Sequence, residues 1–171
     1  MDKGDSSLAV IDVLRDLSAE ALQRLARQCA WKEYAPKQQI VGHQDASRQV
    51  YFLARGRVRA IIYSQAGREV TFRDIEAGEM FGEFAAIDGE PRSASVEALK
   101  PSLVASMAPD LFWQVLRDHP TVTAATLKRL TRQIRALTET KSSPPKVRTR
   151  KLVSVNVPTA PPLIVAPALV T

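Results

Sequence analysis

The sequence predicts an α+β fold in which a jelly-roll barrel, or double-stranded β-helix, is flanked by N-terminal helices and by two C-terminal helices. Three observations predict this fold. Between Ala30 and Met107, short runs rich in Val, Ile, Phe, Tyr and Thr alternate with Gly, Pro, Asp and Gln at close spacing. Apolar residues at helical spacing precede this region and also follow it. So many short strands cannot all be edge strands, and two sheets rolled into a barrel are the economical arrangement.

The N-terminal helices are expected in residues 8–17 and 18–29. In the first segment, Leu8, Ile11 and Leu14 share one helical face. The second segment begins with Ser18, a residue type that caps helix N-termini, and it has an acid in its first turn. Its apolar face is formed by Leu22, Leu25, Ala26 and Cys29.

The strands of the barrel are expected near residues 30–35, 39–42, 48–54, 57–63, 69–75, 92–99 and 102–107. A hairpin turn is predicted at residues 64–67, and another turn at residues 76–78, because glycine and polar residues interrupt the apolar pattern there. An interior of this kind can hold one small ligand.

Two C-terminal helices are predicted, in residues 109–118 and about 120–140, each beginning at a proline. The longer helix has apolar residues at intervals of three and four, as a coiled-coil seam does. This face either packs on the barrel of the same chain or joins two chains into a homodimer. The seam residues are Leu127, Leu130, Ile134 and Leu137.

The last 31 residues, 141–171, differ from the rest. They contain six of the chain's 11 prolines and no acid, glycine or aromatic residue, and they carry five of the six net positive charges. We therefore expect one domain in residues 1–140 and a basic, proline-rich tail without fixed structure. Because residues 1–140 are nearly neutral and the tail has no helix–turn–helix pattern, specific DNA binding is not expected.

The segment Gly78-Glu-Met-Phe-Gly-Glu-Phe-Ala-Ala-Ile-Asp-Gly-Glu-Pro-Arg-Ser-Ala-Ser-Val-Glu-Ala98 resembles the phosphate-binding cassette of cyclic nucleotide-binding domains. That cassette has Gly-Glu, a short helical turn, and then Arg followed by Ser or Thr and Ala. The likeness extends over about residues 8–140, and it is closest to the catabolite activator and FNR superfamily. It implies the jelly-roll fold, with a helical turn at residues 82–87.

The resemblance also implies the ligand contacts. Arg92 would bind the cyclic phosphate, because a guanidinium offers several directed donors to an anion. Glu83 would accept a hydrogen bond from the ribose 2′-hydroxyl, and it could also pair with Arg92; the alternative is that the two form only a structural ion pair. Phe72 would face the purine, and Thr138 the adenine amino group. The remaining expected contacts are Gly82, Phe84, Ala85, Ser93 and Ala94.

Ser93 follows the arginine, as in bacterial cassettes that bind cAMP, whereas threonine is common there in domains that prefer cGMP. The expected ligand is therefore cAMP, and the expected function is a cyclic nucleotide sensor in which binding moves the last helix. Two alternatives stay open. One is a transcriptional regulator of the same superfamily that lacks its DNA-binding domain, and the other is a dimerisation module that needs no ligand.

Other function classes find little support in the sequence. The pair Glu83 and Arg92 offers no nucleophile with a general base, so no enzymatic activity is expected. A single cysteine and two separated histidines do not predict a metal site. No run of about 20 apolar residues and no signal peptide is recognised, so we expect a cytoplasmic protein without a membrane span.

Overall fold

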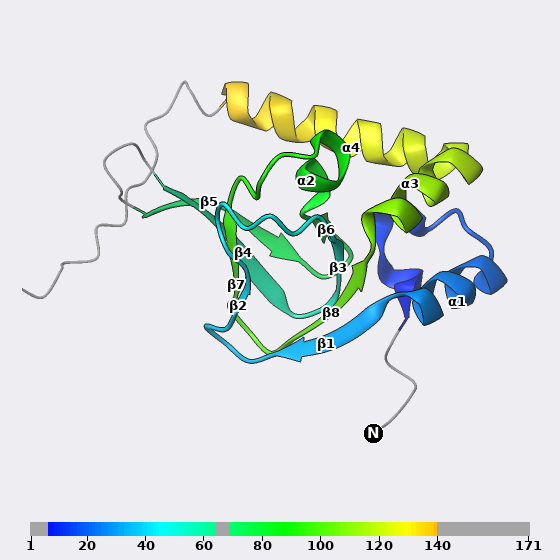
Figure 1. The fold of residues 1–171 in the computed structure, drawn as a ribbon, viewed down its shortest axis with the longest axis horizontal. Helices are drawn as coiled ribbons and strands as arrows, with labels where there is room; N and C mark the ends of the chain where they lie inside the picture. The colour runs from blue at the N-terminus through cyan, green and yellow to red at the C-terminus, as the bar shows by residue number, and fades with distance from the viewer. Residues whose placement is uncertain (1–6, 64–68, 140–171) are drawn as a thin grey trace, which may run out of the picture.

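A computed structural model describes residues 7–63 and 69–139 (Figure 1). Within these ranges, two antiparallel four-stranded sheets form the barrel, with strand orders β1-β8-β3-β6 and β2-β7-β4-β5. The strands are β1 (Ala30–Tyr34), β2 (Gln39–Val41), β3 (Val50–Arg55), β4 (Arg57–Tyr63), β5 (Glu69–Glu76), β6 (Met80–Phe81), β7 (Ser95–Ala98) and β8 (Ser102–Met107). The predicted α+β class, with its rolled pair of sheets, is confirmed.

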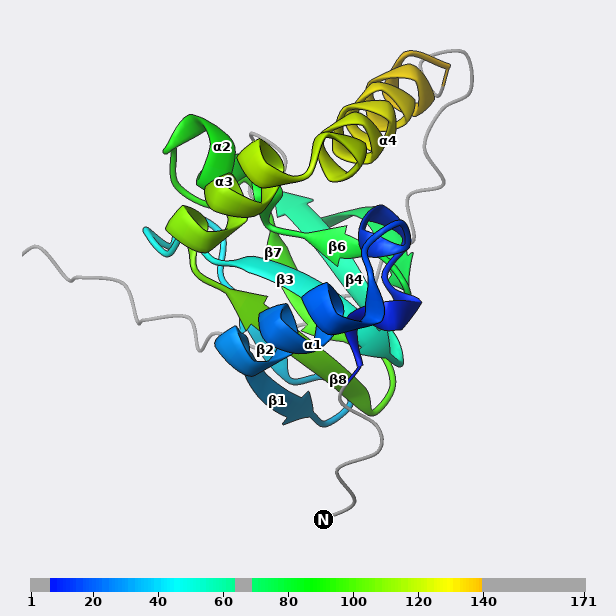
Figure 2. The ribbon, with the colours of Figure 1, turned by 90° about the vertical axis from the view of Figure 1, so that its right-hand side faces the viewer.

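The helices lie outside the barrel, as expected. They are two 3-10 turns, η1 (Leu8–Val10) and η2 (Asp12–Leu14), and four α-helices, α1 (Ala19–Gln28), α2 (Glu83–Asp88), α3 (Pro109–Asp118) and α4 (Pro120–Glu139). In Figure 1, α4 runs along one side of the molecule, next to α2. Figure 2 shows α1 in front of the strands of the first sheet.

Residues 8–17 do not form the predicted continuous helix. The two 3-10 turns are separated at Ile11, whose backbone is extended, with φ −81° and ψ 118°. The break lets the Asp12 N–H donate to the Gly78 carbonyl at 2.9 Å, which ties this segment to the turn after β5. The predicted apolar face is nevertheless buried, since Leu8, Ile11 and Leu14 are each at most 1% exposed.

Strand β3 separates two hydrophobic clusters, because successive side chains of a strand point to opposite faces. Val50 and Phe52 pack on the helical side, with residues of η1, α1 and α3. Leu53 packs between the two sheets, with Val58 of β4. The sheet β1-β8-β3-β6 is thus covered on both faces, while the cluster between the sheets fills the barrel.

Helix α1 begins as predicted, with the Ser18 hydroxyl accepting a hydrogen bond from the Ala21 N–H at 3.2 Å. Cys29 follows the helix and is 8% exposed. Burial raises the pKa of its thiol to about 11, so this cysteine packs as a small apolar residue.

Two strand predictions differ from the structure. Strand β6 was not expected, since two residues are too few to show an alternating pattern. Residues 92–94 do not belong to β7, which begins at Ser95; the Arg92 N–H donates to the Asp45 carbonyl and its carbonyl accepts from the Gln44 N–H, in the loop after β2. The hairpin turn predicted at residues 64–67 lies outside the described residues.

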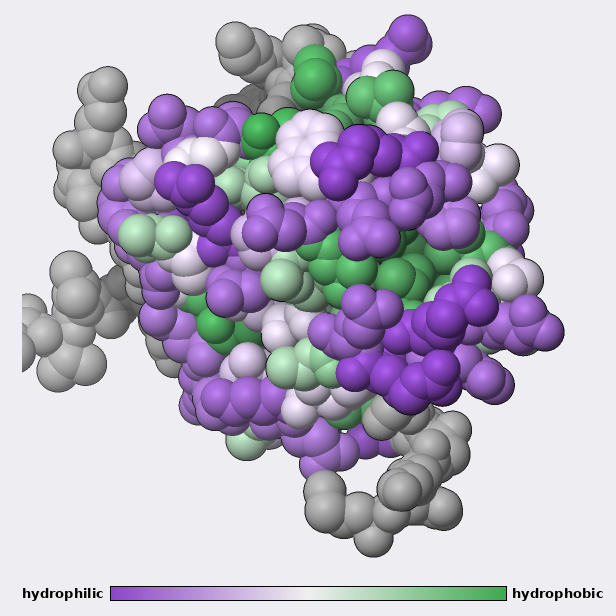
Figure 3. Space-filling view, turned by 45° about the vertical axis from the view of Figure 1, so that its right-hand side comes forward, coloured by the Kyte–Doolittle hydropathy of each residue, from purple (hydrophilic) through white to green (hydrophobic). Residues whose placement is uncertain are grey.

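Hydrophilic side chains surround a strip of apolar surface on the face seen in Figure 3. None of the helices in residues 7–63 and 69–139 is long and apolar enough to cross a membrane. The large apolar side chains most exposed in this part of the chain are Val10, Phe84, Ile87, Trp113, Leu127 and Ile134.

Candidate ligand-binding site

Helix α2 begins at a position that requires glycine. Gly82 has a φ of 78°, in the left-handed region, and an added Cβ would lie 2.6 Å from Arg92 Nη1 and 3.1 Å from Tyr51 Cδ2. A side chain would therefore meet both backbone strain and close contact. The glycine lets the start of α2 approach the Arg92 guanidinium.

A cavity of about 230 Å³ is bounded by α2, by the sheet β2-β7-β4-β5 and by α4. Its wall is mainly apolar with a few polar groups, which is the usual composition of a small-molecule site. The apolar wall includes Val41, Ala60, Ile62, Ile75, Phe81 and Val96. The polar side chains in the wall are Arg73, Glu83, Arg92, Ser93 and Gln133.

The structure brings seven of the nine sequence-predicted contact residues to this one cavity. These residues are Gly82, Glu83, Phe84, Ala85, Arg92, Ser93 and Ala94. The other two, Phe72 and Thr138, lie in β5 and α4, but their side chains lie outside what the structure describes.

The Arg92 guanidinium is 2% exposed and is bound by neutral oxygens. Its Nε donates to Ser47 Oγ at 3.1 Å, Nη1 to the Gly82 carbonyl at 2.8 Å and Nη2 to the Gln49 carbonyl at 2.9 Å. It also lies over the Tyr51 ring, 5.3 Å from the centroid. Burial lowers the pKa of Arg92, but a guanidinium stays charged in proteins. A fixed positive charge thus lies at the cavity wall.

The Glu83 carboxyl is also buried, at 4% exposure. Burial raises its pKa, while the charges of Arg129 and Arg73 and a hydrogen bond with Gln133 oppose that rise. The possible ion pair between Glu83 and Arg92 is not found among the described residues. The nearby charges that act most on Glu83 belong instead to Arg129 and Arg73.

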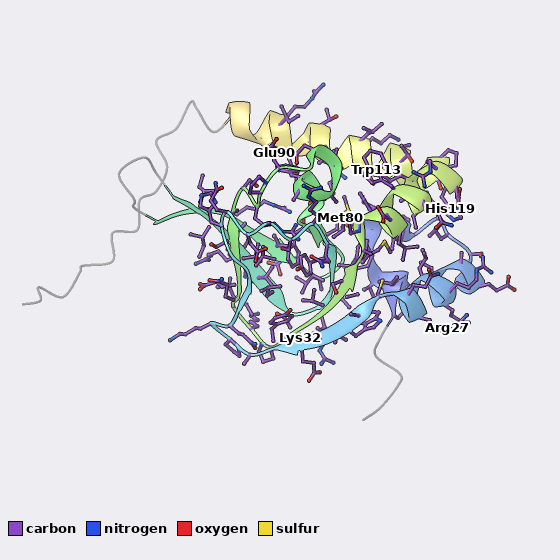
Figure 4. The ribbon with its side chains drawn as sticks, viewed as in Figure 1. Arg27, Lys32, Met80, Glu90, Trp113 and His119 are labelled. Atoms are coloured by element: carbon purple, nitrogen blue, oxygen red, sulfur yellow. The ribbon has the colours of Figure 1, made fainter. Side chains whose placement is uncertain are left out.

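Glu79 links the cavity wall to α4. Its Oε1 accepts from Arg73 Nη1 at 2.8 Å and from Arg129 Nη1 at 2.9 Å, and its Oε2 accepts from the Glu76 N–H at 2.8 Å. Burial pushes the pKa of Glu79 upward, but these hydrogen bonds outweigh it and the net shift is downward. Arg129 also donates to the carbonyl of Met80, a residue labelled near α2 in Figure 4.

Sequence reasoning missed Arg73, Arg129 and Gln133. The inward face of α4 contains Val122, Thr126 and Arg129, which are 1%, 3% and 9% exposed. Of these three residues only Val122 is apolar, so hydrophobic periodicity indicated the other face. Residues 122, 126, 129 and 133 have the spacing of one helical face. This face could have been predicted from the sequence only if polar residues were also accepted as buried.

Metal binding finds no support in the part of the chain that the structure describes. There, no group of three or more His, Cys, Asp and Glu side chains could hold an ion.

Curated relatives share the sequence of the domain. An uncharacterized NTE family protein of Mycobacterium tuberculosis is 26% identical over 130 residues, which are 76% of this chain and 22% of that protein. The lysophospholipase nte1 of Neosartorya fischeri is 26% identical over 102 residues, 59% of this chain and 7% of that protein. The chain therefore spans less than a quarter of the length of these relatives.

Solved structures share the fold. The Thermus thermophilus catabolite activator protein superposes with a TM-score of 0.68 and 23% identity, over 76% of this chain and 61% of that chain. The regulatory domain of Toxoplasma gondii PKA, crystallised with cAMP, superposes with a TM-score of 0.63 and 21% identity, over 72% of this chain and 47% of that chain.

A rolled pair of sheets with a polar-edged cavity beneath a long helix defines a domain that can bind a small ligand. The family model of the cyclic nucleotide-binding domain matches residues 31–119. The chain belongs to that family, as the cassette predicted.

Proposed function

We propose that the chain is a cytoplasmic sensor domain that binds one cyclic nucleotide, preferably cAMP, in the cavity beneath α4. One observation carries this proposal: the buried side chains of Glu83 and Arg92 line the same apolar cavity without forming an ion pair with each other. Buried charges of this kind are costly unless a partner compensates them. A ligand that has both an anionic group and a hydroxyl donor supplies a partner for Arg92 and a partner for Glu83.

The cyclic phosphate would bind beside Arg92 and Ser93, where the guanidinium is already oriented by protein oxygens. The ribose 2′-hydroxyl would donate to the Glu83 carboxylate. Fixing the donors before the ligand arrives reduces the ordering cost of binding.

The purine would lie against the apolar wall, with Phe72 and Thr138 as further contacts. The preference for adenine is supported by Gln133, whose buried Oε1 has no hydrogen-bond partner in the described structure. An amide oxygen accepts a hydrogen bond from an amino group but not from a carbonyl oxygen. The 6-amino group of cAMP would satisfy it, whereas the 6-oxo group of cGMP would not.

The output would pass through α4, which binding repositions. Leu127 and Ile134 on this helix are 59% and 63% exposed, and they lie two turns apart on one face, which supports a homodimer through α4. Leu130 is half-buried, and the side chain of Leu137 lies outside the description. No catalytic role is proposed for this domain, although the fungal relative is named a lysophospholipase.

Calorimetric titration with cAMP and cGMP tests the proposal. The expected result is one site per chain, with cAMP bound more tightly, and a melting temperature that rises with free ligand. Absence of heat and of any thermal shift at millimolar cAMP would reject it, and would favour the ligand-independent dimerisation module. Retention on DNA with strong salt dependence would indicate only nonspecific binding by the basic tail.

A further inference from the structure

Two carboxylates, Glu79 and Glu83, are influenced by the charges of the same two arginines, but their surroundings are unequal. Glu79 is amply paired, because Arg73, Arg129 and the Glu76 N–H all donate to it. Glu83 is more deeply buried, at 4% exposure, and none of the ion pairs in the described residues includes it. The charges acting most strongly on Glu83 are those of Arg129 and then Arg73.

Arg129 connects α4 to this group of charged side chains. It is 9% exposed, and it donates to Glu79 Oε1 at 2.9 Å and to the Met80 carbonyl. Its Nε is buried without a hydrogen-bond partner. One turn later on the same helix, Gln133 lines the cavity together with Glu83 and opposes the rise in the pKa of that carboxyl. The position of α4 over the cavity is therefore coupled to both carboxylates.

We propose that Glu79 is a latch that holds Arg129, and with it α4, in the position of the empty cavity, and that a cyclic nucleotide bound to Glu83 draws Arg129 away from Glu79. This inference rests on the proposed function, since it assigns the contact by which occupancy of that site reaches the helix. A ligand hydroxyl that donates to Glu83 favours its ionised form, and a buried carboxylate then needs a cation.

The unequal pairing makes this exchange possible. When Arg129 leaves, Glu79 keeps Arg73 and the Glu76 N–H, so its charge stays compensated. Glu83 gains the cation that it lacks. A ligand can move α4 only if it binds more tightly to one position of the helix than to the other. Because the contact between Glu79 and Arg129 stabilises the position of the empty cavity, it opposes ligand binding in the native chain.

Glu79→Gln is the direct test, because it keeps the side-chain shape and removes the charge that holds Arg129. The variant should bind cAMP about fivefold or more tightly than the parent, as measured by calorimetry on the full chain. In the free protein, hydrogen exchange in residues 122–136 should become faster. Glu76→Gln is the matched control, since that carboxylate pairs with Arg57 and not with Arg129, and its affinity should stay within about twofold of the parent.

Unchanged or weaker cAMP binding by Glu79→Gln, together with unchanged exchange in α4, would overturn the latch. If the variant fails to fold, Glu79→Asp replaces it, because a shortened carboxylate keeps the charge but loosens the contact with Arg129; tighter binding is again expected, and unchanged binding again overturns the latch. If the parent itself binds no cyclic nucleotide, the proposed function fails. The exchange comparison between free Glu79→Gln and free parent then decides on its own whether Glu79 holds α4.

Discussion

At the scale of single residues, Arg92 serves both the fold and the proposed ligand. Its three bonds to Ser47, Gly82 and Gln49 hold the loop after β2 and the start of α2 around the cavity. We predict that Arg92→Ala weakens cAMP binding by about 30-fold to several thousand-fold, because losing a buried charged partner costs about 2–5 kcal/mol. Calorimetry measures the loss, and circular dichroism checks the fold.

Arg27→Ala provides the control for this change. Arg27 lies in the last turn of α1 and is labelled far from α2 in Figure 4, so its removal should leave affinity unaltered. Binding by Arg92→Ala as tight as that of the parent would mean that the cassette serves only the fold.

Glu83 gives a prediction about pH. Its pKa in the folded state lies above the ordinary value of 4.5, so the fold keeps a proton that the unfolded chain loses. Stability from this residue is therefore greatest below about pH 4.5 and falls as pH rises toward the folded pKa. Glu83→Gln should remove this fall, and the melting temperature of the free variant should exceed that of the parent near pH 7, by about 2–4 °C for each kcal/mol gained.

Thermal unfolding without ligand, from about pH 4 to about pH 8, measures this difference. Glu90→Gln changes the net charge equally at an exposed position after α2, and it should reproduce the pH profile of the parent. A Glu83→Gln profile parallel to that of the parent would show that the Glu83 carboxyl ionises normally in the fold.

The residues of the site differ in how visible they were in the sequence. Glu83 and Arg92 follow Gly82 in a recognisable order, and the structure brings all three to the cavity. Arg129 and Gln133 could not be found in this way, because they come from a helix about 40 residues later in the chain. Burial of a polar side chain depends on its partners in space, which a hydrophobic pattern does not record.

At the scale of elements, α4 has two faces with different tasks. The inward face is partly polar and meets the cavity, while the outward face carries the exposed Leu127 and Ile134. We predict that Ile134→Glu raises the dissociation constant of the proposed α4 homodimer by about tenfold or more, because a carboxylate buried at the contact loses its hydration. Sedimentation velocity over a range of concentrations measures this shift.

Thr121→Glu introduces the same charge at an exposed position in the first turn of α4, away from the outward apolar face, and should leave the dimer intact. A parent chain that stays monomeric at high concentration would contradict the dimer and leave the apolar seam without a partner copy.

The elements best predicted were those with a long periodic pattern. Helix α3 was expected at residues 109–118 and is observed there, and α4 ends within one residue of its expected end. The segment 8–17 was misjudged because 3-10 turns also place every third residue on one side. The hydrogen bond from the Asp12 N–H to the Gly78 carbonyl favours two 3-10 turns over one continuous helix. This bond joins residues that are distant in the sequence.

At the scale of the whole molecule, the described residues form the walls of the cavity around which the site is built. Among the described residues, those that line the cavity lie at or before Gln133. We predict that deleting residues 141–171 leaves cAMP affinity within about twofold and the melting temperature nearly unchanged, since the tail has no apolar face to bury. The deletion should also abolish weak retention on nucleic acid, because this segment carries five of the six net charges.

Titration and thermal unfolding of the shortened chain test this division of the molecule, and elution from an immobilised DNA column tests the charge argument. A large loss of thermal stability would place the tail among the folded parts and extend the domain beyond residue 140.

The barrel itself could be predicted as a class but not as a strand order. Turn density and apolar runs indicate two sheets, yet β1 pairs with β8, so that Ala30 lies opposite Ser106. No local pattern encodes a pairing across that separation. The pairing of β1 with β8 follows from the closure of both sheets around shared hydrophobic clusters. In the sequence, only the family resemblance indicated this strand order.

The buried thiol of Cys29 makes the protein convenient for optical work. It is the only cysteine in the chain, and a pKa of about 11 leaves almost none of the thiolate that maleimide dyes attack at neutral pH. A second cysteine placed on the exposed side of α4 would thus take up a fluorophore selectively. The labelled domain would report, as a change in emission, each movement of the helix over the cavity.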